Sequence, residues 1–342
     1  MKKKVYLEWV RVIAILLVIF NHSDLYYTFY SNTDNLITFI CSLLTSTICR
    51  INVPLFMMVT GALLISREED WKMVIKKRVV RMVMVLVLFS FLLYCLQCLV
   101  WNQGTFSLIN FGQRLMQKDI QPSYWYLYEY LGILLLLPFN RVLARNLSEN
   151  MIRYLLILCS ILKVGGAFAN TLGLLVLPID LFILNDSVFY ILMGYYLENR
   201  IEESRYSKLS YGTISLGILV GIILTSVLVV GNRQLLGGYQ EAVLDVFRPI
   251  IVIPFFALIK KMGIACTNKS LQDIIEKIGG CVFGMYLVEH IGQKIFLPLY
   301  LVLCEKTFGV IACCIYVMCI FAFSLSLTLV LRKVPGVKYL LG

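Results

Sequence analysis

Residues 82–101 read MVMVLVLFSFLLYCLQCLVW and contain no charged side chain. A helix needs about 20 mostly apolar residues to cross the hydrocarbon core of a bilayer. This stretch is therefore predicted to be a membrane-spanning helix, and apolar stretches of similar length recur on both sides of it.

Extended along the chain, the same criterion predicts an all-α polytopic membrane bundle of about ten spanning helices. The chain has 342 residues, of which 60% are hydrophobic and only 15% are charged, whereas soluble domains carry about 25% charged residues. We expect one membrane domain over residues 1–342, with no soluble domain appended. The expected spans are residues 5–27, 40–65, 82–101, 125–140, 154–169, 186–197, 211–230, 243–259, 279–303 and 308–331.

The net charge of +11 indicates topology and does not predict a nucleic-acid partner. Alternate connections between the expected spans hold most of the lysines and arginines, whereas the others hold only Arg114, Lys118, Arg233 and Lys306. Cytoplasmic loops are enriched in lysine and arginine. The pattern predicts a multi-pass protein of the plasma membrane, in direct contact with lipid, whose two termini are cytoplasmic.

The cysteines predict no metal site. Cys95 and Cys98 form a C-x-x-C pattern, but it lies inside an apolar span and has neither a second pair nor a histidine nearby.

A polar stripe follows one face of the first expected helix. His22 lies eleven positions after Arg11, which is 20° more than three full turns at 100° per residue, so the two share a face. Glu8 lies one turn before Arg11, where an ion pair can form. Charged groups inside a membrane are costly and usually face protein or a water-filled cavity. The stripe therefore marks a candidate functional face.

His22 is a candidate general base, because imidazole titrates near neutral pH. The chain has one other histidine, His290. A histidine that merely completes the core is the alternative. Glu129, in the fourth expected span, is predicted at a similar depth and is a candidate to orient the imidazole, although it can equally line an outer vestibule. The roles of Glu289, His290 and Lys294, in the ninth span, stay open between structure and function.

The segment before the third span is strongly basic. Lys77, Arg78 and Arg81 lie within it, and the two arginines, three residues apart, share one helical face. Guanidinium groups bind phosphates through paired hydrogen bonds. A clamp for a polyanion is one interpretation, and an ordinary positive-inside anchor is the other.

Taken in order, these motifs resemble the acyltransferase type 3 membrane family. Its first helix has an arginine, ten residues and a histidine, as at Arg11 and His22. Its second helix carries Val-Pro-Leu-Phe and then Ser/Thr-Gly, as at Val53–Phe56 and Thr60-Gly61. Its third begins with Arg-x-x-Arg, as at Arg78 and Arg81, and a later helix opens with Trp-Tyr-Leu, as at Trp125–Leu127. The ninth span departs from the family's Tyr-Leu-x-His, so the resemblance gives no role to His290.

The resemblance implies a mostly bacterial O-acyltransferase of cell-surface glycans. Acyl-CoA, with acetyl-CoA as the default, would bind from the cytoplasm with its phosphates on Arg78, Arg81 and neighbouring lysines such as Lys77. Arg11 would steer this ligand or hold the helices together, and His22, oriented by Glu129 or another carboxylate, would deprotonate the acceptor hydroxyl. A covalent acyl-histidine intermediate is an alternative.

The expected partners are acyl-CoA, a surface glycan or lipid-linked sugar as acceptor, and separate polysaccharide-assembly proteins where delivery is not direct. Two other functions suit a polar stripe in a membrane bundle. One is transport of a small solute such as an amino acid, and the other is a role in polysaccharide export without chemistry. Which acyl group is moved, and onto which glycan, is not encoded in these motifs.

Overall fold

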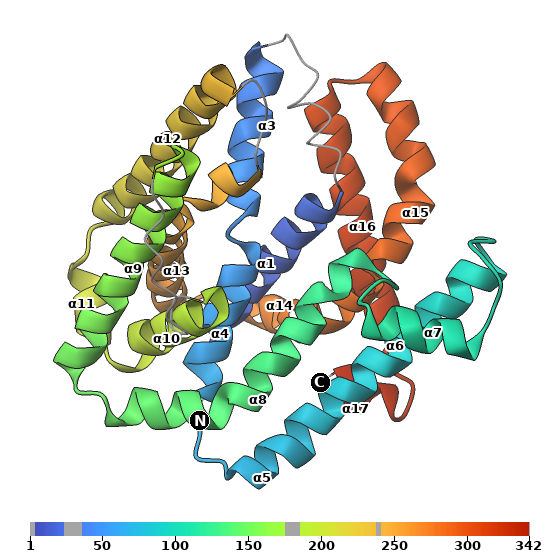
Figure 1. Ribbon diagram of the computed structural model, residues 1–342, viewed down its shortest axis with the longest axis horizontal. Helices are drawn as coiled ribbons and strands as arrows, with labels where there is room; N and C mark the ends of the chain where they lie inside the picture. The colour runs from blue at the N-terminus through green and yellow to red at the C-terminus, as the bar shows by residue number, and fades with distance from the viewer. Residues whose placement is uncertain (1–3, 24–35, 175–184, 237–240, 342) are drawn as a thin grey trace. The chain divides into compact units, whose positions relative to one another are not determined.

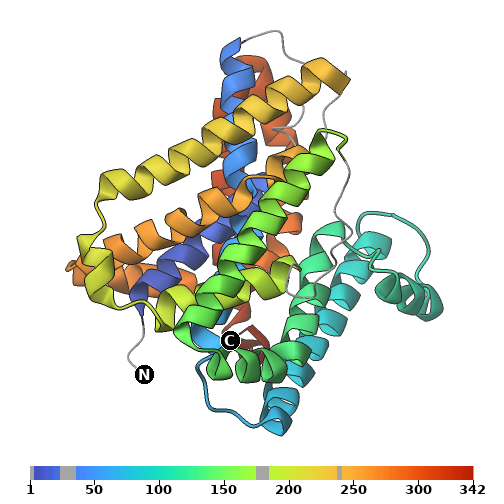
Figure 2. The same cartoon turned by 60° about the vertical axis from the view of Figure 1, so that its left-hand side comes forward.

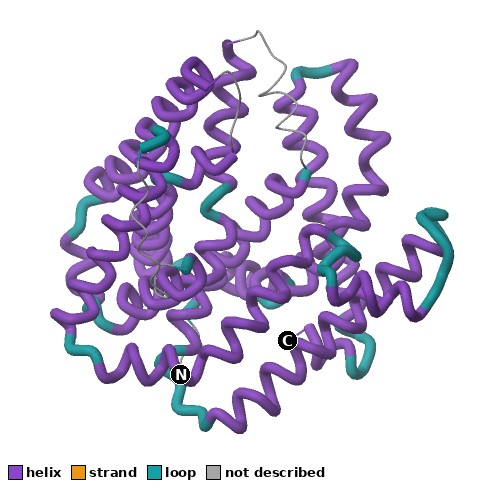
Figure 3. The backbone as a smooth tube through the Cα atoms, viewed as in Figure 1, coloured by secondary structure: helices purple, strands orange, loops and turns teal. Residues whose placement is uncertain are grey.

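The computed structural model describes residues 4–23, 36–174, 185–236 and 241–341 (Figure 1). Over these residues the backbone forms helices, turns and loops, with no strand (Figure 3). A π-helical turn at Ile75–Val79 joins α5 to α6, and short 3-10 turns lie at Pro122–Tyr124 and Glu241–Asp245. The α-helices are α1 (Val5–His22), α3 (Leu36–Cys49), α4 (Asn52–Leu64), α5 (Trp71–Val74), α6 (Val80–Leu99), α7 (Leu108–Met116), α8 (Trp125–Asn146), α9 (Glu149–Thr171), α10 (Asp186–Asn199), α11 (Glu203–Lys208), α12 (Tyr211–Leu236), α13 (Arg248–Ala265), α14 (Lys269–Gly279), α15 (Val282–Lys306), α16 (Gly309–Leu331) and α17 (Val337–Leu341).

The prediction of an all-α polytopic membrane bundle is confirmed. In the described part of the chain, 8 helical segments are long and apolar enough to cross a membrane. Two expected spans are not among them. The segment 186–197 forms α10, whose 14 residues extend about 21 Å, less than the roughly 30 Å hydrocarbon core. The segment 243–259 falls largely in α13, which carries three cations, Arg248, Lys260 and Lys261.

The expected span 40–65 is two helices, because α3 ends at Cys49 and α4 begins at Asn52. The residues between them form a turn, in which the backbone nitrogen of Ile51 donates to the carbonyl of Ile48 at 3.2 Å. The two helices together make one apolar segment, Leu36–Leu64, that is long enough to cross a membrane.

The chain divides into two compact units. Unit 1 comprises Met1–Ser66 and Ala144–Thr328, and unit 2 comprises Arg67–Leu143 and Leu329–Gly342. That the whole chain acts as one membrane domain stays a prediction.

The centre of unit 1 is α1, which packs against α3, α4, α13, α14 and α15 (Figures 1 and 2). Its side chains Val10, Ala14, Ile15 and Ile19 are fully buried. Lipid tails are as apolar as leucine, so helices in a bilayer associate through close packing and polar contacts rather than through the hydrophobic effect. The buried apolar side chains of α1 thus fix the helix among its neighbours, and this packing also positions its polar face.

Two glycines allow α4 and α10 to cross in very close contact. A Cβ atom on Gly61 would collide with the backbone carbonyl of Ile191, and one on Gly194 would collide with the backbone of Met58. Small residues at helix crossings let two backbones approach closely in membranes. The crossing therefore requires glycine at both positions.

Gly61→Ala is expected to destabilise the protein strongly, because the added methyl group meets backbone that cannot move aside. Gly165→Ala, on the exposed face of α9, is the matched control, since a Cβ there meets nothing within 4 Å and alanine is the better helix former. Thermal unfolding in detergent measures both variants. A Gly61→Ala protein that melts with the wild type would contradict the close crossing.

Unit 2 contains α5, α6, α7, α8 up to Leu143, and α17. The loop between α6 and α7 is fixed by Tyr94, whose hydroxyl accepts from the backbone nitrogen of Ser107 at 3.0 Å. Gln97 donates to the carbonyl of Ile120 at 2.7 Å and accepts from Arg114 at 3.2 Å. At the end of the chain, α17 packs against α6 and buries Leu341.

Candidate active site

An imidazole and a carboxylate meet inside unit 1. Nδ1 of His22, the last residue of α1, contacts Oε1 of Glu289 on α15. The carboxylate side chain is completely buried, whereas 18% of the imidazole side chain is exposed. The carboxylate is therefore enclosed by protein, and the ring remains accessible.

The buried carboxylate has polar partners on both oxygens. Gln293 Nε2 donates to the second oxygen, Oε2, at 3.2 Å, and the hydroxyl of Tyr316 on α16 donates to the backbone carbonyl of Gln293 at 2.9 Å. An unpaired charge inside a membrane bundle is costly, and such groups are normally paired with one another. These contacts from α1, α15 and α16 hold the pair in place.

The contact at Nδ1 determines what the imidazole can do. A carboxylate bonded to Nδ1–H holds the ring in one tautomer, which makes Nε2 the nitrogen that accepts a proton, and it stabilises the imidazolium that then forms. The ring of Tyr286 lies at 6.4 Å from that of His22, centroid to centroid. The pair has the features of a general base and its orienting group.

The orienting carboxylate expected from the sequence was Glu129, with another carboxylate left open. Glu129 lies half-buried near the start of α8, in unit 2, and its pairing with His22 stays a prediction. The sequence leaves the role of Glu289 open between structure and function. Its partner lies 267 positions away in the sequence, so only the fold brings the two together.

The Glu8–Arg11 ion pair expected on α1 is confirmed. Arg11 Nη1 lies 3.4 Å from Glu8 Oε2, and the Glu8 side chain is almost fully buried. The backbone of α14 passes directly over this carboxylate, since a Cβ on Gly279 would collide with it. This close approach ties α14 to α1, and a further role of Arg11 in binding ligand stays a prediction.

In unit 2, Arg78 is held by a carboxylate. Its Nε and Nη2 donate to the two oxygens of Glu69 at 3.0 and 2.6 Å. Arg141 of α8 donates to the same side chain at 3.0 Å and to the Glu69 carbonyl at 3.0 Å. The two arginines thus join α8 to the loop before α5, and phosphate binding by Arg78 stays a prediction.

Hydrogen bonds from Arg78, followed by those from Arg141, lower the pKa of Glu69 to about 2. A carboxyl group whose pKa is lower in the folded state stabilises the fold above its unfolded value, near 4.5, and loses this contribution as the pH falls towards 2. In the folded protein the carboxylate therefore stays ionised down to about pH 2, and its full stabilising contribution is present above about pH 4.5.

Glu69→Gln is expected to lower the melting temperature by a few degrees at pH 7, because both arginines lose their counter-charge. The difference from wild type should shrink below about pH 4.5 and vanish near pH 2, where the wild-type carboxyl is itself protonated. Thermal unfolding across this pH range tests it. A difference that is constant from pH 7 to pH 3 would show that the charge is not responsible.

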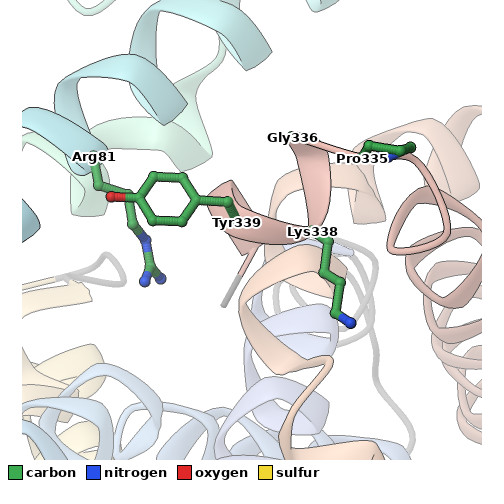
Figure 4. A pocket seen from close by; sticks show the side chains of 5 residues that line it. All are labelled: Arg81, Pro335, Gly336, Lys338 and Tyr339. Atoms are coloured by element: carbon green, nitrogen blue, oxygen red, sulfur yellow. The ribbon is translucent and has the colours of Figure 1, made fainter.

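Arg81 lines a pocket of about 460 Å³ in unit 2 (Figure 4). Its other lining residues come from the C-terminal segment and are Pro335, Gly336, Lys338 and Tyr339. Two cations and no carboxylate therefore line it. Lys77, the third residue predicted to bind anions, is exposed on the π-helical turn and does not line this pocket.

A second charged cluster lies in unit 1, outside the motifs that the sequence indicates. Asp186, at the start of α10, contacts both Lys163 of α9 and Arg248 of α13. Arg248 also donates to Asp245 at 3.1 Å. Both cations fall in expected spans, and a charged side chain inside a membrane is normally paired with an opposite charge. These ion pairs link α9, α10 and α13, which gives both cations a structural role.

The comparisons identify the class of protein. The model of the acyltransferase domain family, type 3, matches residues 4–333. The chain therefore belongs to this family and is a multi-pass membrane acyltransferase. No curated protein and no solved structure matches the chain.

Proposed function

We propose that this protein is an O-acyltransferase that moves an acyl group, by default acetyl, from cytoplasmic acyl-CoA to a hydroxyl of an extracytoplasmic glycan or lipid-linked sugar. The observation that supports it is the contact between His22 and the buried Glu289 in a chain of an acyltransferase family. A hydroxyl acceptor needs a general base, and this pair provides one.

The transfer uses one proton relay. His22 Nε2 takes the proton of the acceptor hydroxyl while the oxygen attacks the thioester carbonyl carbon. The C–S bond of the tetrahedral intermediate then breaks, and the imidazolium returns the proton to the sulfur. The products are an O-acyl ester and CoA with its free thiol. Glu289 stabilises the imidazolium between these two steps.

Acyl-CoA is proposed as the donor because its phosphates suit the basic start of α6. Arg81 lines a pocket there, and Lys77 and Arg78 belong to the preceding turn. The same proposal places this segment and both termini in the cytoplasm, as the positive-inside distribution of charge indicates. It places the protein in the plasma membrane of a bacterium because the family that the chain resembles is mostly bacterial.

Two assays test the proposal. Surface glycans from cells with the wild-type protein should carry ester-linked acyl groups by mass spectrometry, and those from cells with His22→Ala should not. Purified protein in proteoliposomes should transfer label from acetyl-CoA to these glycans. Labelling that is independent of the CoA thioester, or equal acylation with the mutant, would overturn the proposal.

A further inference from the structure

We infer that the C-terminal segment Pro335–Tyr339 forms part of the donor site and, with Arg81, binds the 3′-phosphoadenosine diphosphate end of acyl-CoA. This inference rests on the proposed function and deepens it, because it names a donor-binding element that the motifs do not contain.

The first argument is the availability of charge. Arg78 donates from Nε and Nη2 to both oxygens of Glu69, so the edge of the guanidinium that would form a paired contact with a phosphate is occupied. By contrast, neither the Arg81 nor the Lys338 side chain makes an ion pair or hydrogen bond to another described residue. Two like charges at one pocket repel each other, and a bound phosphate removes that repulsion. Of the two motif arginines, Arg81 is therefore the one available to a ligand.

The second argument is the shape of the pocket. Figure 4 shows the guanidinium of Arg81 and the ammonium of Lys338 directed to the same side, with the ring of Tyr339 extending towards Arg81. The tyrosine side chain is 57% exposed and offers an aromatic face on which a purine can stack. A volume of about 460 Å³ falls within the usual range of small-molecule sites, about 300–1,000 Å³.

The third argument is that the segment is held in place. Gly336 has a φ of +84°, a conformation that glycine adopts without strain, and it turns the chain into α17. Leu341 is buried, and α17 packs against α6. The two halves of the pocket are therefore brought together by a defined turn and an apolar anchor within unit 2.

The segment also lies outside the part of the chain that the family model covers. That match ends at residue 333, and Lys338 and Tyr339 follow it. Residues 329–342 contain no aspartate or glutamate. The family match therefore assigns no role to these two residues.

The inference is tested by equilibrium binding of CoA and of 3′-dephospho-CoA to the purified full-length protein in phosphatidylcholine nanodiscs. Lys338→Ala and Arg81→Ala should each weaken CoA binding about tenfold or more, as expected for loss of a charge-assisted phosphate contact. At least one of them should also abolish the preference for CoA over the dephospho form. Tyr339→Ala should weaken both ligands equally. Lys333→Ala removes an exposed cation two residues before the segment and outside the pocket, and this variant should bind within about twofold of wild type.

The outcomes separate the inference from the function on which it rests. Wild-type protein that binds neither CoA nor acetyl-CoA would overturn the proposed donor and this inference with it. Wild-type binding with unchanged affinity in Lys338→Ala and Tyr339→Ala would overturn the inference alone. An anionic lipid headgroup offers the same phosphate chemistry, so the binding is repeated with phosphatidylglycerol added. If Lys338→Ala weakens the binding of phosphatidylglycerol but leaves the affinity for CoA unchanged, the inference is likewise overturned.

Discussion

Replacing His22 with alanine is expected to reduce acyl transfer on the order of 10³-fold, because the variant has no group that can take the proton of the acceptor hydroxyl. The imidazole is partly exposed and forms the end of α1. Its removal therefore opens little space in the core and should leave membrane insertion intact, while Gln293 still donates to the buried Glu289. Because Glu289 loses its imidazole partner, the melting temperature of the variant is measured beside its rate. The measurement is the initial rate of label transfer from acetyl-CoA in proteoliposomes, at matched amounts of monodisperse protein.

Leu17→Ala is the control for His22→Ala. It truncates a half-buried side chain on the same helix, five residues and thus about 140° away from His22 around the axis. We expect it to transfer within about threefold of wild type. A His22→Ala variant that keeps a rate similar to that of Leu17→Ala would remove His22 from the chemistry.

Replacing Glu289 with glutamine is expected to lower kcat by about 10²-fold or more and to leave the KM for acetyl-CoA unchanged. Glutamine has nearly the same shape but no charge, so the imidazolium loses its stabilising partner. Glu289 acts through His22 and does not itself contact substrate in this account. Steady-state kinetics with varied donor concentration measure kcat and KM separately.

Glu289→Asp distinguishes a charge effect from a packing effect. It restores the negative charge in a shorter side chain, so it should recover part of the lost kcat although it fills the site less well than glutamine. If Glu289 serves only to complete the core, glutamine should be the better tolerated of the two. Higher activity in Glu289→Gln than in Glu289→Asp would contradict the assigned role.

The membrane fold could largely be predicted from the sequence, because lipid requires long uninterrupted apolar stretches and these are visible one segment at a time. The number of spanning helices stays a prediction, because tertiary packing also determines helix length. The segment that forms α10 is apolar, yet it ends after 14 residues and is buried against α4 through Gly61 and Gly194. A buried short helix and a poor spanning helix have the same hydropathy.

The candidate site could be predicted only in part. The stripe of Glu8, Arg11 and His22 follows from the geometry of one helix. The partner of His22 could not be found in this way, because Glu289 belongs to another helix and has no fixed spacing from it.

The sequence also could not show that Arg78 is bonded to a carboxylate whereas Arg81 lines a pocket. The difference arises from Glu69, which bonds Arg78 and whose neighbours Glu68 and Asp70 are also acidic. Nothing in this run of three carboxylates shows which of them pairs with an arginine, so only the folded loop identifies Glu69 as the partner of Arg78.

The double variant His22→Ala/Glu289→Gln tests the central claim most directly. When two residues act as one catalytic unit, removing both costs little more than removing the base alone. We therefore predict a transfer rate within about threefold of that of His22→Ala. If the two losses multiply, Glu289 acts independently of the imidazole, and the account of a paired base would be contradicted.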